Sequence, residues 1–296
     1  IQIEKLKLDY NEAQKIFQLI SPKFKNIKKI NSVFLNCYFD TPNVDAKFQN
    51  LINDQTTDFS RYTFFYANYL IKKDFSKKAN LILKAKLQDV PRNLLLNQLS
   101  LDIKSEKQNY LQNSFDCKNI SHIIAELFYI TANALSTQNL YSLSNFYINL
   151  AKYLNQNFYS YNMLHAENFI MIEDYQKAIK IYLFLKKLGE NYSWHSSKQI
   201  AFLKIDKSET DEAVRILKKS YRNLNSPNLY QTYDFAEFLK NNEKFKESIN
   251  YYTTVLNSIK KDHPLYPEVT EGRGVAYERI GKWDKAEKDL LSSLRA

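Results

Sequence analysis

The side chains best suited to catalysis or metal binding are few in this chain and widely spaced. The four histidines lie 30 or more residues apart, with no H-E-x-x-H or C-x-x-C pattern: His122, His165, His195 and His263. There is no G-x-x-x-x-G-K-[ST] loop, and no strand precedes the G-x-G at Gly272 and Gly274. Acidic pairs such as Glu173–Asp174 stand at expected helix starts, where carboxylates complement the helix dipole. We therefore expect a chain that is not an enzyme and holds no cofactor or metal.

The two cysteines, Cys37 and Cys117, lie 80 residues apart and form no metal-binding or redox motif. Cys37 falls in the apolar run of residues 33–39, where a small buried hydrophobic side chain is the simplest interpretation. Two cysteines exclude a framework of several disulfides, but a single bridge between them stays open.

The charge of the chain is basic and evenly spread. Its 296 residues include 42 Lys and Arg against 32 Asp and Glu, a net charge of +10. An even excess is typical of a solvated surface rather than of a nucleic-acid-binding arm. We interpret the densest basic stretch as a solvated helix face: Lys72, Lys73, Lys77, Lys78, Lys84 and Lys86. No run of 18 apolar residues occurs, which predicts no transmembrane segment in this chain.

The sequence begins with Ile1 rather than Met, so an upstream signal peptide, lipid anchor or further domain is left open. A cytoplasmic and a periplasmic location are both open as well, and so is the oligomeric state.

Small residues recur at intervals of about 34 residues, each in the first third of an amphipathic run. They are Ala13, Ala46, Ala79, Ser144, Ala178, Ala213, Ser248 and Ala286, separated by 33, 33, 65, 34, 35, 35 and 38 residues. An aromatic residue stands three positions earlier in five of the eight, and an apolar residue four positions later in seven. This pattern marks one face of a helix. A small side chain there lets a second helix approach closely, so we expect all eight residues to pack within helix pairs.

A second apolar-periodic stretch precedes most of these helices, and short polar breaks separate the two, which predicts helix–turn–helix repeats and an all-α fold. The 65-residue interval contains one apolar helix at residues 94–103 without a partner. A polar, aperiodic stretch follows it. We expect degenerate repeats at residues 1–104, a linker at 105–119 and clearer repeats at 120–296.

Residues 272–294, GRGVAYERIGKWDKAEKDLLSSL, resemble the tetratricopeptide repeat closely. The matching positions are Gly274, Tyr277, Gly281, Trp283, Ala286 and Leu290, and we expect Gly274, Tyr277 and Trp283 to pack within the repeat. The resemblance extends over nearly the whole chain and includes long bacterial proteins of this family. It implies a right-handed superhelical solenoid of about eight helix pairs.

In that family the first helix of each pair lines a concave groove. Carried over, the groove positions are Tyr129, Asn133, Met163, Glu167, Lys198, Phe202, Tyr233, Glu237, Glu271 and Val275. The mixture of aromatic, Met and charged side chains suits a peptide or a partner helix. The resemblance thus implies a non-catalytic protein-interaction scaffold, and the net charge of +10 favours an acidic partner.

Two other functions stay open. Two of the intervals are 35 residues, the repeat length of pentatricopeptide proteins that bind single-stranded RNA, although the other intervals break that period. An accessory subunit or assembly factor, tethered through a segment upstream of Ile1, is the other alternative.

Overall fold

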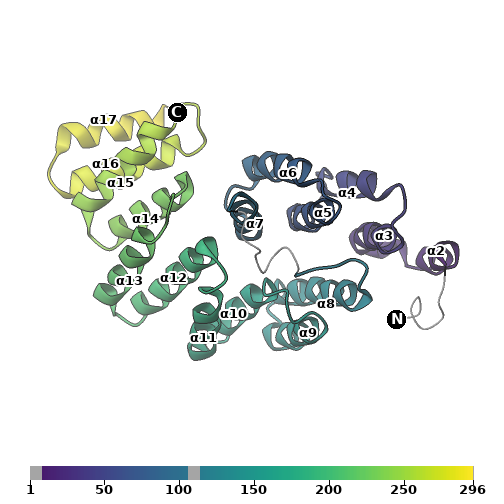
Figure 1. Ribbon diagram of the computed structural model, residues 1–296. Helices are drawn as coiled ribbons and strands as arrows, with labels where there is room; N and C mark the ends of the chain where they lie inside the picture. The colour runs from purple at the N-terminus through teal and green to yellow at the C-terminus, as the bar shows by residue number, and fades with distance from the viewer. Residues whose placement is uncertain (1–8, 106–113, 296) are drawn as a thin grey trace. The chain divides into compact units, whose positions relative to one another are not determined.

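The computed structural model describes residues 9–105 and 114–295 (Figure 1). These two ranges contain sixteen α-helices, one short 3-10 helix and no strand, so the predicted all-α repeat fold is confirmed. None of the helices in the described ranges is long and apolar enough to cross a membrane. The structure divides into two compact units between Tyr192 and Ser193, which we call unit 1 and unit 2.

Unit 1 contains the helices up to α11, and α12 runs across the division into unit 2. In unit 1 they are α2 (Tyr10–Gln18), η1 (Pro22–Phe24), α3 (Lys25–Phe39), α4 (Val44–Ile52), α5 (Ser60–Lys72), α6 (Ser76–Asp89), α7 (Leu94–Lys104), α8 (Ile120–Ser136), α9 (Tyr141–Leu154), α10 (Tyr161–Met171) and α11 (Tyr175–Leu185). The remaining helices are α12 (Glu190–Ile205), α13 (Thr210–Arg222), α14 (Leu229–Asn241), α15 (Phe245–Ser258), α16 (Tyr266–Arg279) and α17 (Trp283–Leu294).

Seven helix pairs are hairpins closed by the same turn: α3–α4, α5–α6, α8–α9, α10–α11, α12–α13, α14–α15 and α16–α17. In each turn one residue has a φ between 53° and 71°: Asp40, Asp74, Asn139, Glu173, Ser208, Glu243 and Gly281. The amide of the next residue donates to a carbonyl five positions earlier, as Phe75 N does to Leu70 O at 2.8 Å. This is the Schellman ending of a helix, and it recurs wherever a first helix turns into its partner.

Two helices stand outside these hairpins in the described residues. One is α2, which packs on α3, and the other is α7, which packs on α5 and α6 and corresponds to the unpaired helix expected at residues 94–103. The described chain therefore holds seven hairpins where about eight helix pairs were expected.

Seven of the eight recurring small residues are buried: Ala13, Ala79, Ser144, Ala178, Ala213, Ser248 and Ala286. Gly274 is also buried, and a Cβ there would come within 2.9 Å of Leu290. Ser144 adds a hydrogen bond across its hairpin, because its hydroxyl donates to Ala132 O at 2.7 Å.

Ala46 and Trp283 differ from the packing predicted for them. Ala46 is exposed, because α4 packs through Val44 and Phe48. Ala46 lies two positions from each of these, on the opposite side of the helix. Trp283 is 64% exposed at the first position of α17, and Tyr277 is half-buried.

Residues 106–113, most of the predicted linker, lie outside the described residues, and the domain division at 105–119 stays a prediction. The described part that follows is packed in unit 1. Phe115 is buried, Lys72 Nζ donates to its carbonyl at 3.1 Å, and Asn155 Nδ2 donates to Ser114 O at 2.9 Å.

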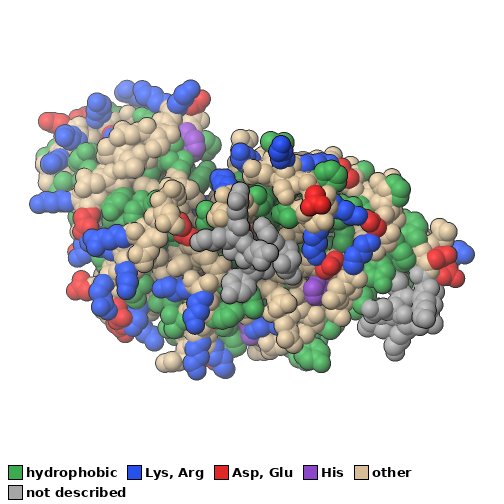
Figure 2. Space-filling model, in the orientation of Figure 1, with side chains coloured by type: hydrophobic (Ala, Val, Ile, Leu, Met, Phe, Trp, Pro, Cys, Tyr) green, Lys and Arg blue, Asp and Glu red, His purple; other side chains and the backbone are tan. Residues whose placement is uncertain are grey.

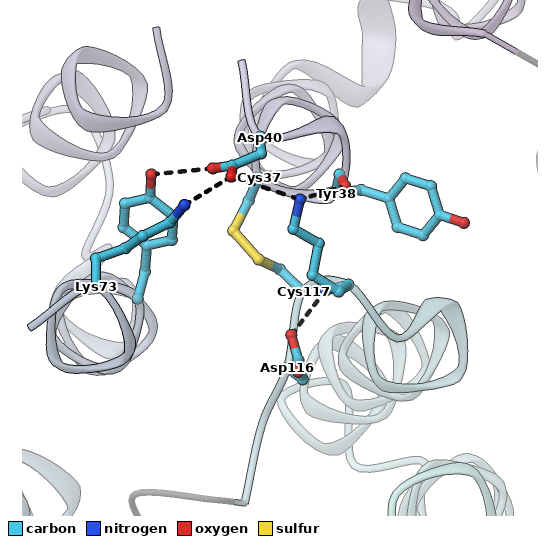
Figure 3. A network of polar contacts seen from close by, with 8 residues as sticks. Cys37, Tyr38, Asp40, Lys73, Asp116 and Cys117 are labelled. Carbon is cyan, nitrogen blue, oxygen red and sulfur yellow. Dashed lines mark hydrogen bonds and ion pairs between the residues drawn. A yellow bond between two sulfur atoms is a disulfide. The ribbon is translucent and has the colours of Figure 1, made fainter. Parts of the chain in front are cut away.

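A disulfide between Cys37 and Cys117 joins α3 to the segment that precedes α8 (Figure 3). The simple interpretation of Cys37 as a free buried side chain is therefore replaced by the single bridge that the sequence left open. Ion pairs surround the bridge. Asp40 accepts a hydrogen bond from Lys73 Nζ at 2.6 Å, and this bond holds the pKa of Asp40 below its usual value. Lys118 Nζ donates to Tyr38 O at 3.1 Å, on the same side of the bridge.

Candidate functional site: the first helices of the repeats

The predicted groove residues lie on the first helices of five consecutive hairpins. In unit 1 α8 carries Tyr129 and Asn133, and α10 carries Met163 and Glu167; in unit 2 α12 carries Lys198 and Phe202, α14 carries Tyr233 and Glu237, and α16 carries Glu271 and Val275. The two groups are described separately because their surroundings differ.

In unit 1, helix α5 covers part of the first-helix surface. The Arg61 guanidinium of α5 lies over the Tyr129 ring of α8, 4.0 Å from its centre. Arg61 also forms two hydrogen bonds to the Glu126 carboxylate, at 2.7 and 2.9 Å, and a third to Ser160 Oγ at 3.2 Å. The Tyr129 ring in turn lies 5.2 Å from that of Tyr161. Tyr129 is thus engaged within the chain, where the sequence predicted a contact for a partner.

Arg61 and Glu126 are a buried pair of opposite charges. Burial raises the pKa of Glu126, and Arg61 opposes this shift. Burial lowers the pKa of Arg61, but the Glu126 carboxylate and nearby tyrosines more than offset this, so Arg61 stays a cation. A buried pair of this kind is costly to break, since either partner alone would be an uncompensated charge. Its role is to fix α5 against α8 and α10.

The other unit 1 positions are more open. Asn133 and Glu167 are exposed and Met163 is half-buried. Burial raises the pKa of Glu167 nonetheless. His165, on the same helix, is buried: its Nδ1 lies 3.3 Å from Lys152 Nζ, and its ring lies 4.7 Å from Phe169.

In unit 2 the first helices α12, α14 and α16 present one continuous set of side chains, which we call the unit 2 face: Lys198, Phe202, Tyr233, Asp234, Glu237, Lys240, Glu271 and Val275. Lys198 of α12 pairs with Asp234 of α14 at 2.6 Å, and Lys240 Nζ lies 2.9 Å from Glu237 Oε2. The hydroxyl of Tyr252 donates to Glu237 as well. Two of the predicted charged residues, Lys198 and Glu237, therefore already have partners on this face.

The aromatic residues of the unit 2 face differ in exposure. Phe202 is 44% exposed, with only its edge against Phe238, whose ring centre lies 6.0 Å away. Tyr233 is half-buried, 6.4 Å from the ring of Tyr252. Glu271 is exposed and Val275 half-buried. Phe202 is thus the large apolar side chain that this face leaves open to a partner.

Gly272 allows α16 to approach α14 and α15 closely. A Cβ at this position would come within 2.6 Å of the Tyr252 hydroxyl and 2.7 Å of Glu237 Oε1. The G-x-G at residues 272–274 is therefore a packing motif inside a helix, as its lack of a preceding strand indicated.

Sequence reasoning missed Asp234, Lys240 and Arg273. Lys198 and Asp234 are 36 residues apart, close to one repeat, so the repeat interval could have suggested that they meet. Arg273 binds Asp289 of α17 through two hydrogen bonds, at 2.6 and 2.9 Å, and also Thr253 of α15 at 3.1 Å. These bonds fix the last hairpin against the one before it.

Among the described residues, no group of three or more His, Cys, Asp and Glu side chains could hold a metal ion. Burial and the charge of Lys198 lower the pKa of His195 to about 4, so this histidine is neutral near pH 7.

No protein-family model matches the chain, and no curated protein sequence matches it either. Three solved structures resemble it. One is YrrB, a TPR protein with an unusual peptide-binding site (16% identity, 57% of this chain and 84% of that chain, TM-score 0.39). Another is the Cut9–Hcn1 hetero-tetramer of the APC/C (14% identity, 99% of this chain and 58% of that one, TM-score 0.44). The third is the TPR domain of P58(IPK) (12% identity, 97% and 88%, TM-score 0.29).

All three are tetratricopeptide-repeat proteins, the family that the sequence resembles. The described chain has the helical-hairpin repeat fold of this kind of protein. That statement rests on the chain's own seven hairpins and their common turn.

Proposed function

We propose that this chain is a non-catalytic scaffold that binds a peptide or a helix of a partner protein along the unit 2 face. The observation that supports this most directly is the exposure of Phe202 beside the Lys198–Asp234 ion pair, on adjacent first helices. An exposed aromatic side chain supplies apolar contact area, and interface energy concentrates in a few such residues. The neighbouring charges set orientation and partner choice more than affinity.

The partner should insert an apolar side chain beside Phe202 and Tyr233. Its polar groups would compete for the paired charges of Lys198, Asp234 and Lys240, and Glu271 is exposed to receive a donor. An acidic partner remains our expectation from the net charge of +10.

A basic surface that binds nucleic acid is less well supported. Within the densest basic stretch Lys72 pairs with Asp116 at 3.1 Å, Lys73 with Asp40 at 2.6 Å and Lys78 with Asp45 at 2.7 Å. These carboxylates offset much of the positive charge that phosphate groups would need. Figure 2 shows the same mixture, with acidic side chains interspersed among basic ones on the visible face.

The test is capture of partners from a lysate of the source cells by the full chain and by two variants. The double variant Phe202→Ala/Tyr233→Ala should lose the captured protein, with affinity at least about tenfold weaker in a binding assay. Phe75→Ala is the matched control, because Phe75 is 59% exposed and lies in unit 1. Circular dichroism checks that both variants stay helical. If capture survives the double variant and is lost when Lys72, Lys73, Lys77 and Lys78 are changed to Gln, the unit 2 face is not the binding site.

A further inference from the structure

The outward side of α9 in unit 1 is unusually apolar and carries almost no charge. Leu143, Phe146 and Tyr153 are 47%, 56% and 76% exposed, and their spacing of three and seven residues places them on one side of the helix. The other side of α9 packs on α8 and α10. Hydrophobic side chains reach the surface over this helix in Figure 2. Between residues 119 and 166 the charged side chains are Lys152 and Glu126, and Glu126 is buried against Arg61.

A pocket of about 420 Å³ opens at the C-terminal end of this stripe. Its polar lining includes Lys152 of α9 and Lys180 of α11, and its apolar wall includes Tyr159 and Phe184, whose rings lie 5.1 Å apart. No carboxylate lines it, and among the described residues neither lysine is in an ion pair. The nearest carboxylate that senses Lys180 is Asp174, which pairs directly with Lys177.

Lys152 is half-buried and meets a neutral group. Its ammonium lies 3.3 Å from His165 Nδ1, and burial lowers the pKa of Lys152. Burial also lowers the pKa of His165 to about 4, with the charge of Lys152 adding to the effect. The positive charge of Lys152 is therefore not balanced by any described group of the pocket, so an anion entering it would be attracted.

Asn155 provides a second polar group without a full set of partners. It lines the pocket and is 2% exposed. Its Nδ2 donates to Ser114 O, while its Oδ1 accepts no hydrogen bond from the described residues. A buried acceptor of this kind costs free energy unless a donor reaches it, and an N–H group of a bound chain would be such a donor.

We propose that this surface, the α9 stripe (Leu143, Phe146, Tyr153) with its lysine pocket, binds an acidic segment of a partner protein that carries bulky apolar side chains. A carboxylate of that segment lies between Lys152 and Lys180, and an aromatic or aliphatic side chain packs on Tyr153 and Phe184. Charge complementarity selects this occupant, since the pocket offers two cations and no carboxylate. A second copy of this chain fits worse, because a symmetric pairing would bring lysine toward lysine. The site lies in unit 1 and is separate from the unit 2 face.

The test uses N-acetyl-phenylalanine as a minimal probe, in its carboxylate form and as the uncharged amide, with binding to the full chain measured by NMR titration. The carboxylate should bind at least about tenfold more tightly than the amide. Lys152→Gln should weaken carboxylate binding to a similar degree, whereas Lys246→Gln, an exposed lysine of α15 in unit 2, should leave it unchanged. Carboxylate binding should also raise the pKa of His165, because the anion offsets the charge of Lys152.

Equal binding of acid and amide, no binding of either, or an unchanged affinity in Lys152→Gln would overturn the proposal. Thermal unfolding of each variant verifies that it is folded. Two further arms identify the other occupants of an apolar face. If Phe146→Ser abolishes sedimentation with vesicles containing an anionic phospholipid, or abolishes a concentration-dependent dimer, and the carboxylate probe does not bind, the stripe is a membrane or self-association surface instead.

Discussion

At the scale of single residues, spacing identified most of the packing positions and misplaced two. Ala178 and Ala213 are fully buried, as the interval of 35 residues predicts for hairpin crossings. Ala46 has the same 33-residue spacing from its neighbours and is nevertheless exposed, because α4 begins at Val44 and packs through that residue. The register of a short helix depends on where it begins, and spacing alone does not give that position.

Replacing Ala178 by Trp should destabilise unit 1, whereas replacing Ala46 by Trp should have little effect. Ala178 is 0% exposed, so a larger side chain must displace its neighbours, which costs about 1–3 kcal/mol or more. Ala46 is exposed and has room for the ring. Chemical denaturation of both variants gives the two free energies of unfolding. Equal losses would show that our assignment of the buried side of these helices is wrong.

Buried His165 should make stability depend on pH between about 6.5 and 4. Burial, followed by the charges of Lys152 and Lys177, lowers its pKa to about 4, while the unfolded chain has the usual 6.5. As pH falls through this window the unfolded state takes up a proton that the folded state does not. Up to about 3 kcal/mol of stability is therefore lost on going down in pH, and none further below pH 4.

The variant His165→Asn isolates this effect from that of the other titrating groups. Its free energy of unfolding should fall less steeply than that of the unchanged chain between pH 6.5 and 4, and denaturation at several pH values measures the difference. Parallel pH profiles would contradict the neutral, buried state of His165.

At the scale of elements, the hairpin turn is the most regular feature, yet sequence revealed it at one position. Gly281 matches the turn glycine of the family resemblance, while the other six turns place non-glycine residues at positive φ. Asp and Asn tolerate this region, but Glu173 and Glu243 have no such preference. Schellman hydrogen bonds and hairpin packing impose the conformation there, which local propensity could not foretell.

Glu243→Gly should therefore stabilise the chain by about 1 kcal/mol, because glycine adopts a φ of 61° without a clash at Cβ. The same change at Glu287, an exposed position inside α17, should destabilise by about 1 kcal/mol through lost helix propensity. Thermal or chemical denaturation of the two variants gives opposite signs on this account, and a loss at both positions would contradict it.

The contact between α5 and α8 was beyond sequence reasoning. Arg61 and Glu126 are 65 residues apart, and nothing in the repeat pattern marks them, since that pattern predicts contacts between consecutive helices. Their pairing covers Tyr129, a residue that the family resemblance assigned to the groove. The prediction of groove positions is therefore better supported in unit 2, where Phe202 is exposed and no other described element covers its ring.

At the scale of the whole molecule, the Cys37–Cys117 bridge closes a loop of 80 residues and should stabilise unit 1. In the chain-entropy view a loop of this length contributes about 4 kcal/mol. The double variant Cys37→Ser/Cys117→Ser, or the chain with a reducing agent, should unfold at a lower temperature than the oxidised chain. Calorimetry with and without the reductant measures the change. An unfolding temperature that is the same in both conditions would show that the bridge does not stabilise the fold.

The central claim is that a partner protein binds the unit 2 face, and site-specific photo-crosslinking tests it most directly. A photoreactive phenylalanine analogue replaces Phe202 in one chain and Phe75 in another, since both side chains are exposed and they lie in different units. After irradiation in the source cells, the account predicts one dominant protein adduct at position 202 that is absent at position 75. No adduct at position 202, or the same adducts at both positions, would contradict it.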